Sequence, residues 1–264
     1  MRIPVLMYHR VGKAHNQWES RYCISPELFE KHMRHLSAQG MQACSLGDFF
    51  DWIDRKTQLP EGSFLLTFDD GFAGVYEHAA KVLQELGWPA TVFLVSQLIG
   101  KQDEWCQSQN PSGATYPLLT AEDIEAMRNM GFCFHSHTRL HPDLTTLPED
   151  QLASELRGSR ADLKALLNED VRYLAYPYGR YNDNVLNAAR AAGYEAAFST
   201  QPGFNRHGVD PFRIRRLDIS GTDTPAMLSR KIHYGSNDGT WRQTFRYYKG
   251  RLIDRLGIRH RESA

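Results

Sequence analysis

Short apolar runs rich in β-branched and aromatic residues alternate along the chain with segments of helical periodicity. This alternation is typical of β–α units that build a parallel sheet, either open or closed into a barrel. We expect strands over residues 3–7, 64–68, 90–95, 132–134, 172–176, 195–198 and 212–217. We expect helices over residues 26–39, 73–86, 121–130, 149–166 and 182–192.

The longest irregular stretch runs from about residue 96 to residue 119 and contains several glycines and prolines. A loop of this length in a compact domain usually has a function. We interpret it as a loop on the substrate side of the fold, with Trp105 as a substrate contact. A tolerated surface insertion is the alternative.

Length and composition predict one large α/β domain. The chain has 264 residues, of which 41% are hydrophobic and 23% are charged, so it can bury a sizeable core and is not a disordered protein. Its 31 basic and 31 acidic residues cancel, which disfavours nucleic acid as a partner. No secretion signal or membrane span is visible, and the four cysteines are scattered singly as expected of reduced thiols. We therefore expect a cytoplasmic protein.

The last segment differs in character from the rest, so we divide the chain into a main α/β domain, residues 1–240, and a basic tail, residues 241–264. The tail carries seven Lys or Arg residues against two acidic ones, and its apolar residues recur at steps of three and four. We expect an amphipathic helix that docks on the barrel. Peripheral contact with the inner face of an anionic membrane is the alternative.

Two adjacent carboxylates, Asp69 and Asp70, directly follow the apolar run 64–68, and Gly71 follows them. The carboxyl end of a parallel strand is where such folds place their active sites. Adjacent carboxylates repel each other, and a divalent cation that binds one leaves the other free to accept a proton from water. An ordinary Asp-Gly turn is the alternative interpretation of this motif alone.

Three histidines, His135, His137 and His141, stand at the end of another apolar run. His137 and His141 are four residues apart, so one turn of helix-like backbone can direct both imidazoles to one point. Two imidazoles and a carboxylate, with Asp70 as the third ligand, leave coordination positions open for water and substrate. A surface pair or a hydrogen-bonded core pair of histidines is the alternative.

A third strand runs into aromatic residues interleaved with proline and glycine. Tyr176, Pro177 and Tyr178 are expected to form a rigid wall suited to stacking on sugar rings. The backbone N–H of Tyr178 is a candidate for polarising a developing oxyanion. A plain Pro-Tyr-Gly turn is the alternative.

Together these motifs resemble those of the polysaccharide deacetylase family, also called carbohydrate esterase family 4 or the NodB homology domain. Residues 67–71, 137–141 and 175–179 are similar to its first, second and third motifs, in matching order and spacing. The resemblance implies a distorted (β/α)7 barrel with Asp69 as general base. It also implies that Asp70, His137 and His141 hold the metal, and that the Tyr178 amide helps to stabilise the tetrahedral intermediate.

Two positions depart from the family pattern. Ala175 stands where many members have an arginine that orients the catalytic aspartate. Arg213, Arg215 and Arg216 are candidates for that task, and we select Arg213 and Arg215; a solvated basic strand end is the alternative. His135 stands where the family commonly has a small residue, so it is expected to crowd the site or reach the substrate.

The family's last motif, an apolar residue, any residue and then a histidine, supplies the general acid. Near the C-terminus only the weak candidate Ile232-His233 is found, whereas Met7-Tyr8-His9 ends the first apolar run. This predicts a circular permutation, similar to the family branch that contains the poly-N-acetylglucosamine deacetylases. We therefore predict His9 as the general acid, with a buried structural histidine as the alternative.

These expectations describe a metal-dependent hydrolase that removes the acetyl group from an N-acetylated amino sugar in a polysaccharide or lipid-linked glycan. Zinc is the first choice of metal, and cobalt, nickel or iron also suit such ligands. Alternatives with the same site are an O-deacetylase, a deformylase of a lipid-linked sugar, or a hydrolase of a small cyclic amide. A carbohydrate-binding protein that lacks catalysis and an iron(II) oxygenase are alternatives of other classes.

Overall fold

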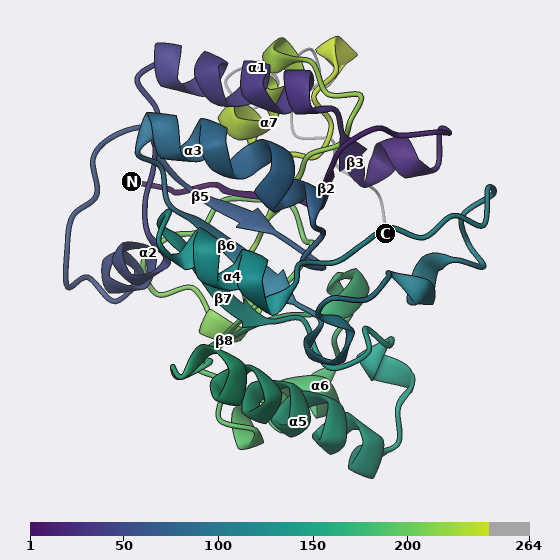
Figure 1. Ribbon diagram of the computed structural model, residues 1–264. Coiled ribbons are helices and arrows are strands. Elements are labelled where there is room, and N and C mark those ends of the chain that lie inside the picture. Colours follow the sequence, from purple (N-terminus) through teal and green to yellow (C-terminus); the bar gives the residue numbers. More distant parts are fainter. Residues whose placement is uncertain (243–264) are drawn as a thin grey trace, which may run out of the picture.

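The computed structural model describes residues 1–242 and is built around a curled parallel sheet with helices packed on its outer side (Figure 1). The main strands lie in the order β10-β1-β5-β6-β7-β8-β9, and every neighbouring pair is parallel. They are β1 (Val5–Tyr8), β5 (Ser63–Phe68), β6 (Ala90–Leu94), β7 (Phe132–Ser136), β8 (Tyr173–Ala175), β9 (Ala196–Phe198) and β10 (Leu217–Asp218). Outside this order, β4 (Gln42–Ala43) pairs with β5, and β2 (Arg10–Val11) pairs with β3 (Cys23–Ile24).

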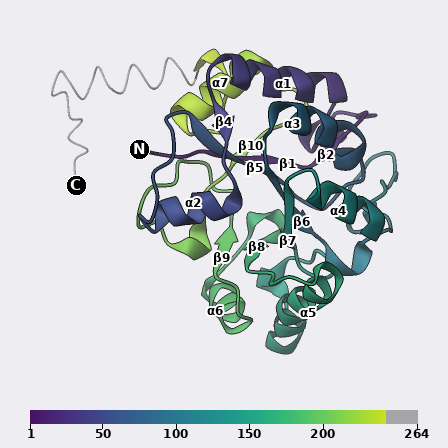
Figure 2. The ribbon, with the colours of Figure 1, turned by 60° about the vertical axis from the view of Figure 1, so that its left-hand side comes forward.

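Helices surround the sheet, as the turned view makes clear (Figure 2). They are α1 (Pro26–Ala38), α2 (Leu46–Ile53), α3 (Ala80–Leu86), α4 (Ala121–Arg128), α5 (Glu149–Leu167), α6 (Asp183–Ala191) and α7 (Pro225–Tyr234). Side-chain caps fix several of their starts; for example, the Ser25 hydroxyl accepts a hydrogen bond from the Leu28 backbone N–H at the start of α1.

The alternation of side chains along the strands separates two layers of the core. On β5, Phe64 and Leu66 belong to the layer between sheet and helices, whereas Leu65 belongs to the smaller layer inside the curled sheet. Thr67 and Asp69 follow Leu65 at steps of two and therefore share its inner face. The inner face is thus apolar at its base and becomes polar at the carboxyl ends of the strands.

The opening strand lies within the sheet, because β1 is paired on one side with β5 and on the other with β10. The sheet is brought towards closure by Ile214, whose backbone N–H donates to Ala197 and whose carbonyl accepts from Ser199. The predicted fold, an α/β distorted barrel, is confirmed.

Several expected elements differ in detail. The strand predicted over 212–217 is instead a 3₁₀ turn (Pro211–Arg213) followed by the short β10, since the Asp210 side chain accepts from the Phe212 backbone N–H and caps the turn. The helix predicted over 73–86 begins with a π-helical turn, Val75–Ala79. Helices α2 and α7 were not predicted. The predicted strand and helix positions otherwise agree with the structure to within a few residues.

Within the described part of the chain, no helix has the length and apolarity needed to cross a membrane. The predicted tail, residues 241–264, lies outside the described residues except for its first two. Its amphipathic helix and its membrane contact therefore stay predictions.

Candidate active site

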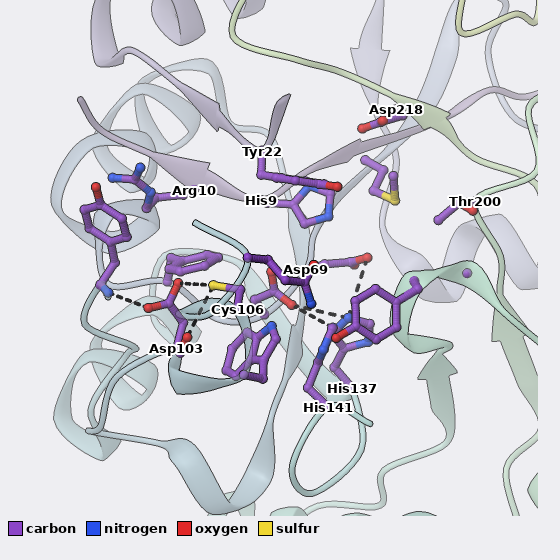
Figure 3. A pocket seen from close by; sticks show the side chains of 18 of the residues that line it. His9, Arg10, Tyr22, Asp69, Asp103, Cys106, His137, His141, Thr200 and Asp218 are labelled. Atoms are coloured by element: carbon purple, nitrogen blue, oxygen red, sulfur yellow. Dashed lines mark hydrogen bonds and ion pairs between the residues drawn. The ribbon is translucent and has the colours of Figure 1, made fainter. Parts of the chain in front are cut away.

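A pocket of about 380 Å³ lies at the carboxyl ends of β1, β5 and β7 (Figure 3). Three residues that line the pocket each directly follow a strand: His9 follows β1, Asp69 follows β5 and His137 follows β7. The sheet therefore gathers side chains from distant parts of the sequence at one edge, which is the edge that parallel α/β folds use for catalysis.

Asp70, His137 and His141 form a buried triad whose ligand atoms all lie within 4.8 Å of one another. The Nε2 atoms of His137 and His141 are each 3.4 Å from Asp70 Oδ1. Asp70 has a φ of 72°, and Gly71 follows with a φ of 78°, so the chain turns sharply after β5 and directs the carboxylate back towards the histidines.

The surroundings of the triad fit a bound cation. His137 Nδ1 is 2.8 Å from the Ala175 carbonyl oxygen, so this nitrogen carries the proton and Nε2 offers its lone pair towards Asp70. Asp70 Oδ1 is buried and has no hydrogen-bond partner within residues 1–242. A buried acceptor between two imidazole nitrogens is costly unless a positive charge compensates it. The residues present therefore suit a divalent metal.

The charges of the triad support this assignment. Burial would raise the pKa of Asp70, but its contacts with His137 and His141 outweigh burial and hold the pKa well below its usual range. Burial lowers the pKa of His141 to about 3, so its imidazole is in the neutral, ligating form at physiological pH. Burial also opposes the charged form of His137, but nearby Asp69 and Asp70 raise its pKa.

Asp69 lies beside the triad and forms an ion pair with an arginine. The Arg216 guanidinium donates to both carboxylate oxygens of Asp69, at 2.6 and 2.7 Å, and its Nε donates to the Ser199 carbonyl at 2.9 Å. Both partners of this bidentate pair are buried. Burial would raise the pKa of Asp69, but Arg216 and His137 outweigh it and lower the pKa. Asp69 is therefore ionised and fixed in orientation.

The structure corrects the choice of arginine. Arg213 pairs with Asp210, and Arg215 donates to the Pro202 carbonyl; within residues 1–242 neither contacts Asp69. Ile214 lies in the inner core layer, and Arg216, two residues further on, shares its face. Arg213 and Arg215 alternate with Ile214 and project away from the pocket. The alternation was readable in the sequence and identifies Arg216.

His9 lies on the other side of Asp69 from the two histidine ligands (Figure 3). Its Nδ1 atom is buried without a hydrogen-bond partner among the described residues, and so is Oδ1 of Asp218, which lies beside Met7 in the β1–β10 register. Burial raises the pKa of Asp218, and the His9 charge opposes this rise. Asp218 was not singled out from the sequence, since three of the six residues before it are arginines and no apolar run marks the strand end.

Two of the predicted substrate contacts line the pocket with accessible rings. Trp105 stacks on His141 with ring centroids 4.8 Å apart, and Tyr178 meets the same imidazole edge-on at 4.7 Å. Tyr178 is 43% exposed, and its backbone φ of 58° turns the chain at the rim of the pocket. Both rings are available to a ligand that approaches the triad.

The other three predicted substrate contacts are corrected by their burial. Tyr176 borders the pocket but has no exposed surface; its hydroxyl donates to the Phe212 carbonyl. Pro177 is also buried. His135, on β7, precedes His137 by two residues and therefore faces the same inner side of the sheet. It packs against Tyr173, with ring centroids 4.8 Å apart. Burial lowers the pKa of His135 to about 3, so it is a neutral core residue.

A hydrogen-bond network that the sequence did not reveal forms one wall of the pocket. The buried Glu19 carboxylate accepts from Arg10 at 2.9 Å, from Asn110 at 3.0 Å and from the Tyr116 hydroxyl at 2.8 Å. These contacts join the segment after β1 to the predicted substrate-side loop. The predicted substrate-side loop therefore lines the pocket. Backbone hydrogen bonds before and after Trp105, from Asp103 to Tyr116 and from Asn110 to Cys106, hold the segment that carries it.

The motifs that surround this pocket are those of a known family. The family model for polysaccharide deacetylase matches residues 56–197, which is more than half of the chain. The chain belongs to the polysaccharide deacetylase family. The protein is thus a hydrolase of that family, and the predicted resemblance is confirmed.

Relatives agree with this family assignment. YxkH of Bacillus subtilis (strain 168), whose name places it in the same family, is 27% identical over 219 residues, which span 83% of this chain and 72% of YxkH. The poly-beta-1,6-N-acetyl-D-glucosamine N-deacetylase of Staphylococcus aureus (strain COL) is 24% identical over 258 residues, which span 89% of this chain and 84% of that enzyme. The structure of IcaB from Ammonifex degensii superimposes with a TM-score of 0.71 at 26% identity, covering 83% of this chain and 92% of IcaB.

Proposed function

We propose that this polysaccharide deacetylase is a divalent-metal-dependent N-deacetylase that acts on an N-acetylated amino sugar of a polysaccharide. The observation that carries the proposal is the buried Asp70–His137–His141 triad beside a separately held carboxylate, Asp69. The substrate class is supported by the family and by relatives whose names specify poly-N-acetylglucosamine. Zinc is the metal that the two imidazoles and one carboxylate favour.

Each residue has a task that follows from its contacts. When bound, the divalent cation supplies Lewis acidity that polarises the acyl carbonyl and acidifies water. Asp69, kept ionised by Arg216, accepts the proton of the attacking water. The backbone N–H of Tyr178 supports the negative charge of the tetrahedral intermediate. His9 lines the pocket and donates a proton to the departing sugar nitrogen.

Product analysis with and without chelator tests the proposed reaction. Purified protein is incubated with a panel of N-acetylated oligosaccharides, and released acetate and free amine are measured together. We expect equal amounts of both, loss of turnover after chelation and recovery on adding Zn²⁺ or Co²⁺. Formate in place of acetate, or acetate without free amine, indicates a deformylase or an O-deacetylase. Turnover that survives complete removal of metal contradicts the proposal.

Replacing His9 with Ala is expected to lower kcat on an N-acetylated sugar by a factor of roughly 10²–10⁴, the usual contribution of a positioned general acid. Metal content should not change, because His9 is not in the triad. An aryl acetate needs little protonation of its leaving group, so the variant should lose much less activity on that substrate. An equal loss on both substrates, or none on either, contradicts the assignment of His9 as the acid.

A further inference from the structure

The loop that carries two of the triad residues, residues 137–141, has an unfavourable backbone. Thr138 has a φ of 70° and His141 has a φ of 61°, although neither is a glycine. Left-handed conformations of such residues persist only where the surrounding structure holds them. The position of His141 therefore depends on what holds this loop.

Part of the support comes from the loop itself and from the chain after β6. The Ser136 hydroxyl accepts from the Thr138 backbone N–H at 3.1 Å, and the Thr138 hydroxyl accepts from the His141 backbone N–H at 3.1 Å. The backbone N–H groups of Ser96 and Gln97 donate to the carbonyls of Thr138 and Arg139. These bonds leave the N–H groups of Arg139 and Leu140 to be satisfied from elsewhere.

Helix α5 supplies that remaining support. Glu155 Oε2 accepts from the backbone N–H groups of both Arg139, at 2.9 Å, and Leu140, at 3.1 Å. Gly158 lies one turn further along α5, and Asp162 lies two turns further. Asp162 Oδ2 accepts a hydrogen bond from Arg139 Nε at 3.0 Å. These three positions of α5 lie on one face of the helix.

At Gly158 the Arg139 side chain lies directly against the helix. A Cβ atom at this position would be only 2.4 Å from Cδ of Arg139, which lies across the helix between its two anchors. A glycine in a helix interior otherwise disfavours the helix. The close approach of Arg139 accounts for its presence here.

We propose that the α5 face formed by Glu155, Gly158 and Asp162 is a positioning element that sets the affinity of the triad for metal, with Glu155 as its principal residue. A single carboxylate bonded to two successive N–H groups fixes the two peptide planes between Thr138 and Leu140, in the middle of the loop that carries His141. Residues that orient metal ligands in this way typically change metal affinity 10- to 100-fold. The inference rests on the metal site of the proposed function but not on the substrate.

Metal titration of the apoprotein tests this role without using activity. Affinity for Zn²⁺ is measured by competition with a chromophoric chelator, for the parent protein and for E155A and E155Q. We expect E155A to bind Zn²⁺ roughly 10- to 100-fold more weakly. E155Q should lie between, because its amide oxygen still accepts a hydrogen bond but carries no charge. The control is E149Q, an exposed residue in the first turn of the same helix, with unchanged affinity expected.

The G158A variant separates positioning from general stability. Alanine favours the helix interior over glycine, so the melting temperature of the apoprotein should stay equal or rise, while the added Cβ displaces Arg139 and weakens Zn²⁺ binding. In an R139A background the same change should have no further effect on affinity. Unchanged Zn²⁺ affinity in folded E155A overturns the proposal. If E155A does not fold, parent-like affinity in both E155Q and G158A overturns it equally.

Discussion

Replacing Asp69 with Asn is expected to reduce kcat by a factor of roughly 10²–10⁴ without loss of bound metal. Asn has nearly the same shape but cannot accept the proton of the attacking water. The metal should stay because the triad, Asp70 with His137 and His141, does not include Asp69. Steady-state kinetics on an N-acetylated oligosaccharide, with metal content measured on the same sample, checks both parts.

The matched control for this prediction is the neighbouring carboxylate. D70N should lose most of its metal and, with it, its activity, and added metal should restore activity only in part. The two adjacent aspartates thus give different signatures from the same substitution. If D69N lost its metal as D70N does, Asp69 would be a ligand and the division of roles between the two would be wrong.

Replacing Arg216 with Met is expected to destabilise the protein by about 3–5 kcal/mol at pH 7, the usual cost of leaving one member of a buried ion pair without its partner. The pKa of Asp69 is lower in the folded protein than in the unfolded chain, so its ionised carboxylate stabilises the parent protein. This contribution is fully present above about pH 4, the pKa of an unperturbed Asp, and is lost as the pH falls through the pKa of Asp69 in the folded protein. In R216M burial raises that pKa instead, so the variant loses stability as the pH rises. Urea unfolding should therefore show a smaller difference between the two proteins at pH 5 than at pH 7.

The double variant R216M/D69N provides the control for this prediction. Removing both charges relieves the uncompensated carboxylate, so the double variant should be more stable than R216M alone. Where R216M retains turnover, the acid limb of its pH–rate profile should lie at higher pH than in the parent, because protonated Asp69 cannot act as base. A double variant as unstable as R216M would show that Arg216 acts through packing and not through charge.

Strand alternation and motif position were enough to predict that Asp70, His137 and His141 lie together with Asp69 beside them. Asp69, Asp70 and His137 each follow a buried apolar run, and parallel strands bring their carboxyl ends to one edge. The same reasoning applied to Ile214 would have identified Arg216. Arg216 was among the three candidate arginines, but the choice of Arg213 and Arg215 did not take the inward face of Ile214 into account.

Burial of individual rings could not be predicted in the same way. Tyr176 and Tyr178 are two residues apart in one motif, yet the first is in the core and the second is at the pocket rim. The turn at Pro177–Gly179 separates them; the sequence offers a turn here, but not the left-handed conformation of Tyr178 that turns the chain at the pocket rim. The Glu19 network was missed for a related reason, since its partner Asn110 lies 91 residues away in sequence.

The order of the strands has a consequence for how the site is assembled during folding. The proposed metal ligands come from about one contiguous quarter of the chain, between residues 70 and 141, whereas His9 lies near the beginning and Arg216 much further along. Pairing of β1 with β10 closes a loop of about two hundred residues, and contacts of such long range form slowly. An intermediate in which these two strands have not yet met would bind an ion but would hydrolyse nothing.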